Sequence, residues 1–165
     1  MKLLDEQQVE KKLERLAIEI LENNYNTKEI ILAGINNNGL SFAELLQERL
    51  LKHDPKKKVS LTQISLSPAK PLESEITIGK SAKELKNKVV IIVDDVANTG
   101  RTIFYAFKPF MDVLPKRIEV AVLVDRKHKS FPIKVDYMGM SLATTVEENI
   151  QVRIRGKRDR AVFLK

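Results

Sequence analysis

The stretch from Val89 to Thr102 reads VVIIVDDVANTGRT, and it decides which fold the rest of the chain can adopt. Five β-branched apolar residues run into two carboxylates, a pattern typical of a central strand that is buried on both faces. Asp94 and Asp95 would then stand at the carboxyl edge of a parallel sheet, where α/β folds bind ligands. The turn that follows, from Ala97 to Thr102, offers backbone N–H groups and hydroxyls before a helix begins. These groups together predict an anion site.

Length and composition favour a single domain over residues 1–165, because 43% of the residues are hydrophobic and 31% are charged. The chain contains no cysteine and only two histidines, so disulfides, thiolate metal sites and histidine clusters are excluded. No apolar run reaches the roughly 20 residues that span a bilayer, and the first residues turn acidic too early for a signal peptide. We therefore expect a cytoplasmic protein with no membrane partner.

Strands and helices are predicted to alternate along the whole chain, on the basis of apolar spacing. The predicted helices cover residues 5–23, 40–53 and 102–114, the last with Pro109 inside it, and the predicted strands cover 29–35, 59–66, 75–78, 89–93 and 118–124. This alternation favours an α/β fold with a parallel sheet of about four or five strands and helices on both faces.

The acidic pair and the turn suit a sugar phosphate, because carboxylates accept hydrogen bonds from vicinal hydroxyls while the turn holds a phosphate. This stretch resembles the phosphoribosyl-pyrophosphate motif of type I phosphoribosyltransferases. The resemblance implies that Asp94 and Asp95 hold the ribose 2′ and 3′ hydroxyls and contact Mg²⁺ indirectly, through ribose and water. It also implies a 5′-phosphate site in the turn, at Ala97, Asn98, Thr99, Gly100, Arg101 and Thr102. The alternative is an ordinary buried strand and turn.

A second resemblance covers residues 123–139, LVDRKHKSFPIKVDYMG. The family of bifunctional pyrimidine-operon attenuation regulators and uracil phosphoribosyltransferases has Val-Asp-Arg-x-His, then Pro-Ile, then Asp-Tyr-x-Gly at this spacing. The similarity extends over about residues 29–155. It implies the type I phosphoribosyltransferase fold with a small hood from the chain ends, Mg²⁺ as cofactor, and a homodimer.

The turn Asn36-Asn37-Asn38-Gly39 follows the first strand of this sheet and matches the turn that contacts pyrophosphate in the family. That turn commonly includes Lys or Arg. Asparagine amides donate hydrogen bonds and tolerate a left-handed backbone, but they cannot neutralise a pyrophosphate. Lys70 lies in the Pro-rich segment 67–74, where the family has a mobile loop, and it is the candidate to reach pyrophosphate. The alternative for Lys70 is a plain surface lysine.

Asp125 closes the next buried strand at the same edge of the sheet, and it is placed to touch Mg²⁺–pyrophosphate or the edge of a base. Arg126 is a candidate phosphate or base contact, with a surface salt bridge as the alternative. His128 is expected to be exposed rather than a general acid or an RNA contact. Tyr137 is expected in the core rather than beneath a base.

The predicted reaction transfers ribose 5-phosphate from phosphoribosyl pyrophosphate to a nucleobase, with a pyrimidine such as uracil as acceptor. The alternative is a nucleotide-sensing regulator that binds RNA and has weak or no transferase activity. Residues 151–165 carry six basic side chains and one acidic one. Alternation around Val152 and Ile154 predicts a strand with Arg153 and Arg155 on one face. We favour a solvated or hood-packing face there over an RNA-binding one.

Overall fold

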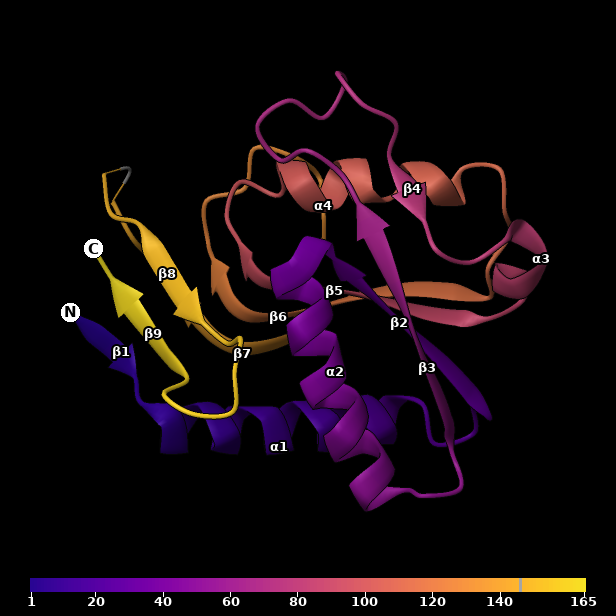
Figure 1. Cartoon of the computed structure of the whole chain (residues 1–165), viewed down its shortest axis with the longest axis horizontal. Coiled ribbons are helices and arrows are strands. Elements are labelled where there is room, and N and C mark those ends of the chain that lie inside the picture. The colour runs from indigo at the N-terminus through magenta and orange to yellow at the C-terminus, as the bar shows by residue number, and fades with distance from the viewer. Residues whose placement is uncertain (146) are drawn as a thin grey trace.

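A computed structural model describes residues 1–145 and 147–165 of the chain, and a six-stranded sheet forms its centre (Figure 1). The strands lie in the order β4-β3-β2-β5-β6-β7, and all neighbours pair in parallel except β3 and β4. Their bounds are β2 (Glu29–Ile35), β3 (Lys58–Ser65), β4 (Thr77–Ile78), β5 (Val89–Ala97), β6 (Arg117–Arg126) and β7 (Tyr137–Leu142). The predicted α/β fold with a parallel sheet is confirmed.

Helices cover both faces of this sheet (Figure 1). The long helices α1 (Glu6–Asn23) and α2 (Asn36–His53) lie on one face, and α3 (Ala82–Leu85), α4 (Arg101–Ala106) and the 3₁₀ turn η1 (Lys108–Phe110) lie on the other. Successive side chains of β5 point to opposite faces, so Ile91 and Val93 pack with α1 and α2 while Val90 and Ile92 pack with α4. The central strand is therefore buried on both faces, as its sequence predicts.

The order of the strands reverses direction between β2 and β5. From β2 the chain passes through α2 to β3 on one side, whereas from β5 it passes through α4 to β6 on the other side. The carboxyl ends of β2 and β5 therefore diverge into loops that leave a crevice between them. Ligands of open α/β sheets bind at such a point.

A second, three-stranded sheet is built from both ends of the chain. Strand β9 (Ala161–Leu164) lies between β1 (Lys2–Leu4) and β8 (Ile150–Arg153), and both pairings are antiparallel. This sheet is the predicted hood, and it lies beside the main sheet at the carboxyl end of β5 (Figure 1). None of the described helices combines the length and the apolar character needed to cross a bilayer.

The structure corrects several predicted boundaries. Helix α2 begins at Asn36 rather than at residue 40, so the asparagine turn forms its first turn. The Asn36 backbone there has φ 51°, and its side-chain amide bonds to the backbone of Leu66. The predicted helix 102–114 ends as α4 at Ala106 and continues only as η1, since Pro109 has no N–H to donate. Strand β5 extends to Ala97, and β7 was not predicted at all.

Candidate functional site

A cleft of about 380 Å³ opens at the carboxyl edge of the main sheet, between β2 and β5. The main sheet contributes the ends of β2 and β5, and the hood contributes side chains from β8 and the segment after it. The cleft is lined by Ile35, Asn36, Asn37, Asn38, Pro68, Asp94, Asp95, Val96, Asn98, Thr102, Ile150 and Arg155. The structure thus brings together the acidic pair, the asparagine turn and part of the predicted phosphate turn.

Asp94 and Asp95 form the acidic side of this cleft. Asp94 is 9% exposed, and its carboxylate accepts a hydrogen bond from the Asp95 N–H at 2.9 Å. Asp95 is half-buried, and its two oxygens accept from the Val96 N–H at 2.9 Å and from the Asn38 amide at 3.0 Å. Each carboxylate is therefore held in place by the local backbone before any ligand binds.

Burial raises the pKa of the Asp94 carboxyl well above its ordinary value, and the neighbouring Asp95 carboxylate raises it further. A hydrogen bond from the Asp95 N–H acts in the opposite direction but does not outweigh the other two effects. The cleft is thus prepared for a cation or for hydroxyl donors, because either would stabilise the ionised form of Asp94.

The raised pKa of Asp94 makes the stability of the ligand-free protein depend on pH. An unfolded aspartate ionises near pH 4, whereas folded Asp94 ionises only at higher pH, so the free energy of unfolding falls as pH rises through that window. We expect Asp94→Asn to be more stable than wild type at pH 7 and equally stable below about pH 4. Urea unfolding from pH 4 to 8 measures this difference. A constant difference across that range would contradict it.

The described residues contain no group of three or more carboxylate, histidine or cysteine side chains that could hold a metal ion alone. The cleft does present two carboxylates together with amide oxygens. Mg²⁺ binds hard oxygen ligands, keeps several waters, and commonly uses one or two carboxylates plus substrate phosphates. These residues therefore fit Mg²⁺ that enters with a phosphorylated substrate.

The predicted phosphate turn follows β5 directly and encloses a small hollow of about 40 Å³. Gly100 has φ 87°, which directs the backbone around the hollow. No backbone hydrogen bond from the N–H of Thr99, Gly100 or Thr102 is found within the described residues. Because α4 has only six residues, these N–H groups rather than a helix dipole would hold an anion.

Gly100→Val is expected to be more damaging to phosphate binding than Thr99→Val. A Cβ on Gly100 would lie 2.7 Å from Cγ1 of Ile133, and its φ disfavours a β-branched residue. Thr99→Val keeps the shape of its side chain and loses only a hydroxyl, which accepts a long 3.4 Å bond from the Arg101 N–H. Titration of both variants with ribose 5-phosphate measures which of them loses more affinity. Equal losses of affinity in the two variants would contradict the prediction.

The three asparagines of the turn have separate partners. The Asn36 amide bonds to both backbone groups of Leu66, and the Asn37 oxygen accepts from Gln63 at 3.2 Å. Asn38 alone is directed across the cleft, since it donates to Asp95 and accepts from Arg155 at 2.8 Å. Gly39 lets this turn lie against β5, because a Cβ there would be 2.5 Å from the Val93 carbonyl oxygen.

Asp125 and Arg126 lie at the end of β6, beside the phosphate turn. Asp125 pairs with Ala97 across the strands and forms an ion pair with Lys129 at 2.7 Å. Arg126 donates to the Asn98 oxygen at 3.2 Å and to the Thr144 hydroxyl at 2.6 Å. Neither residue lines the cleft itself, so their roles toward a base stay predictions.

The remaining predicted residues lie farther from the acidic pair. Lys70 is 66% exposed and pairs with Glu73 on the loop between β3 and β4, outside the cleft. Arg101 donates to the Pro68 carbonyl at 2.8 Å, which joins that loop to the phosphate turn. His128 is exposed, as predicted, and contacts the Thr144 carbonyl.

Tyr137 is fully buried, as predicted for a core residue, and its hydroxyl donates to the Glu119 carboxylate at 2.7 Å.

The strand predicted around Val152 is β8, and the alternation is as predicted, since Arg153 and Arg155 are exposed while Val152 and Ile154 are more buried. The basic side chains of this end nevertheless have different partners. Arg153 lies over the ring of Phe163, 4.7 Å from its centroid, and Arg160 is paired with Glu10 at 2.7 Å. Arg155 instead reaches the cleft. No pattern in the sequence signals this placement, because Arg155 and Asn38 are 117 residues apart.

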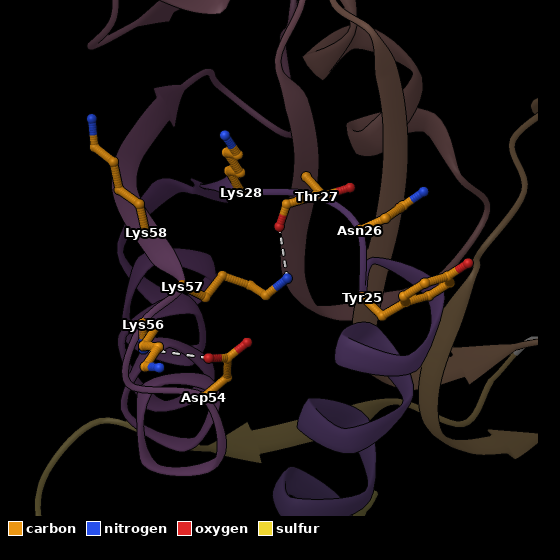
Figure 2. Close-up of a pocket in the computed structure, with 8 residues that line it drawn as sticks. All are labelled: Tyr25, Asn26, Thr27, Lys28, Asp54, Lys56, Lys57 and Lys58. Atoms are coloured by element: carbon orange, nitrogen blue, oxygen red, sulfur yellow. Dashed lines mark hydrogen bonds between the residues drawn. The ribbon is translucent and has the colours of Figure 1, made fainter.

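A second hollow, of about 400 Å³, lies at the opposite edge of the sheet (Figure 2). Although four lysines line it, Figure 2 shows Lys28 and Lys58 extending away from it. Lys57 is buried, and its ammonium donates to the carbonyls of Asn24 and Thr27, both at 2.7 Å. The lysines do not converge on a common point, so the cleft at the carboxyl edge is the candidate site.

Comparisons with known proteins show the family to which the chain is related. The phosphoribosyl transferase domain family matches residues 2–155. The bifunctional protein PyrR of Macrococcus caseolyticus is 34% identical over 157 residues, which cover 92% of this chain and 90% of that protein. The bifunctional protein PyrR of Alkaliphilus metalliredigens is 37% identical over 158 residues, with 92% and 87% covered.

Solved structures share the same fold at low sequence identity. A hypoxanthine-guanine phosphoribosyltransferase from Bacillus anthracis superposes with a TM-score of 0.76 and 22% identity, covering 99% of this chain and 96% of that one. A hypoxanthine phosphoribosyltransferase of Trypanosoma cruzi gives a TM-score of 0.78 and 17% identity, with 98% and 95% covered. At such identities the likeness concerns the fold alone.

Proposed function

Because the chain belongs to the phosphoribosyl transferase domain family and is a phosphoribosyltransferase, we propose that its cleft binds phosphoribosyl pyrophosphate and transfers the ribose 5-phosphate group to a pyrimidine, with uracil as the first candidate. The observation that carries this proposal is the arrangement at the end of β5. There a preformed acidic pair stands next to a turn with free N–H groups, at the point where the strand order reverses.

In the proposed reaction the bond between ribose C1′ and the pyrophosphate oxygen breaks, and a bond from C1′ to a base nitrogen forms. Pyrophosphate leaves with the electron pair of the broken bond, and the base nitrogen gives up its N–H proton to the leaving pyrophosphate or to water. The positive charge that develops on the ribose ring resembles that of glycosyl transfer in general. Such a reaction needs positioning and electrostatic stabilisation rather than a protein nucleophile.

Each part of the cleft has a role in this proposal. Asp94 and Asp95 accept hydrogen bonds from the ribose hydroxyls, and their negative charge stabilises the developing positive ring. The turn Ala97–Thr102 binds the 5′-phosphate through its backbone. Mg²⁺, when bound, supplies positive charge to the leaving pyrophosphate. Asp125 and Arg126, at the neighbouring strand end, are proposed to contact the base.

We further infer a homodimer in the cytoplasm, in line with the family resemblance. Exposed apolar side chains at Met111 and Leu114 offer area for a partner copy.

A transfer assay tests the proposal directly. The protein is incubated with phosphoribosyl pyrophosphate, Mg²⁺ and one base at a time from a panel of pyrimidines and purines, and nucleotide is separated by chromatography. We expect uridine monophosphate to accumulate fastest. Transfer to purines only would overturn the choice of base, and binding of nucleotides without any transfer would favour the regulator that senses nucleotides.

A further inference from the structure

Arg155 is the only basic side chain among the described residues that line the cleft. It follows β8 in the hood, so a segment near the end of the chain places it over a turn near the beginning. Its Nε donates to the Asn38 oxygen at 2.8 Å, and the Asn38 amide donates to Asp95 at 3.0 Å. A continuous chain of hydrogen bonds therefore joins the hood, the asparagine turn and the acidic pair.

The terminal nitrogens of Arg155 remain available for a ligand. Among the described residues, only its Nε takes part in a hydrogen bond, and no carboxylate lies within ion-pair distance of it. Arg155 is also an exposed residue, so its guanidinium stays hydrated until a ligand arrives. A guanidinium presents a planar fork of donors that matches phosphate oxygens in pairs.

The charges in the cleft explain why such a cation is needed. Two carboxylates and four neutral amides line the cleft, whereas pyrophosphate carries several negative charges. The basic groups near the cleft have other partners. Lys70 pairs with Glu73, Lys129 pairs with Asp125, Arg126 bonds to Asn98 and Thr144, and Arg101 bonds to the Pro68 carbonyl. Of the basic side chains that the structure describes, Arg155 alone combines a position in the cleft with unpaired donors.

We propose that Arg155 is a pyrophosphate-binding residue, and that the hood supplies through it the positive charge that the asparagine turn lacks. This inference rests on the proposed function. Asn38 acts as a positioning residue in it, because its oxygen fixes the Nε of Arg155 and leaves the two terminal nitrogens directed to the ligand.

Calorimetric titrations of Arg155→Gln separate this role from a structural one. Mg²⁺-pyrophosphate and phosphoribosyl pyrophosphate should bind about ten- to a hundredfold more weakly than to wild type, the effect of losing a charge-assisted hydrogen bond. Uridine monophosphate contains no pyrophosphate, so its affinity should stay within about twofold of wild type. Thermal melting verifies that the variant is folded.

Arg153→Gln is the matched control, because it removes the same charge two positions away on the same segment, where the side chain lies over Phe163. It should leave all three affinities unchanged. Unchanged pyrophosphate affinity in Arg155→Gln, or an equal loss for uridine monophosphate, would overturn the inference. If wild type binds neither phosphoribosyl pyrophosphate nor uridine monophosphate, the proposed function itself fails, and the two failures are thereby distinguished.

Discussion

Asp95→Asn is expected to lower transfer by about a hundredfold or more while the protein remains folded. The substitution removes a charge-assisted hydrogen bond to a ribose hydroxyl, which contributes roughly 1.5–3 kcal/mol. It also disturbs the bond from the Asn38 amide, because the new side chain carries a donor of its own where Asp95 only accepts. The variant thus loses the hydrogen bond to the ribose and the bond that positions Asn38. The transfer rate should therefore fall by more than the loss of a single hydrogen bond would give.

Steady-state rates at saturating phosphoribosyl pyrophosphate, together with calorimetric affinities, measure this effect. Asp159→Asn is a suitable control, because Asp159 is exposed and has φ 61°, a backbone region that asparagine tolerates well. The control should retain wild-type rates. Unchanged affinity in both Asp94→Asn and Asp95→Asn would refute the assignment of the acidic pair to ribose.

Gly34→Ala is expected to give the largest loss of stability among single-methyl additions in the main sheet. A Cβ on Gly34 would lie 2.4 Å from Cα and 2.5 Å from the backbone nitrogen of Leu40, so neither neighbour can rotate away. Strand β2 and helix α2 would have to separate. Such overpacking costs about 3 kcal/mol, which lowers Tm by roughly 9 °C in a domain of this size.

Pyrophosphate affinity should fall in the same variant, because the first turn of α2 carries Asn38 toward Arg155. Gly156→Asn provides the control, since no atom lies within 4 Å of its Cβ position, so any loss of stability there comes from its φ of 97° and not from a clash. Differential scanning calorimetry compares the two. A Tm for Gly34→Ala within about 2 °C of the control would contradict the expected clash.

The main sheet and the acidic pair could be predicted from the sequence, because the residues that indicate them are adjacent in the chain. An uninterrupted Val/Ile run predicts the buried strand, and the two aspartates after it predict the edge at which ligands bind. The family, the fold and the transferase activity inferred from this stretch are confirmed by the family match over residues 2–155 and by the identity to PyrR proteins.

The contacts that complete the cleft do not have a local signal. The bond from Arg155 to Asn38 depends on the pairing of β1, β8 and β9, which joins residues from opposite ends of the chain. In sequence, Arg153 and Arg155 look equivalent, and only the packing of Arg153 on Phe163 separates them. The bond from Asn36 to Leu66 likewise has no local signal, because the two residues are 30 positions apart.

The hood also sets an order of events during synthesis on the ribosome. Strand β1 emerges first, but its partner β9 pairs Leu4 with Val162, so the pair forms only after most of the chain has been made. At elongation rates of about 5–20 residues per second, β1 waits roughly 10–30 s for this partner. The centre of the main sheet has no such delay, because β2 pairs with β3 and β5 within the first hundred residues. In a nascent chain, Asp94, Asp95 and the phosphate turn would therefore be in place before Arg155 reaches the cleft.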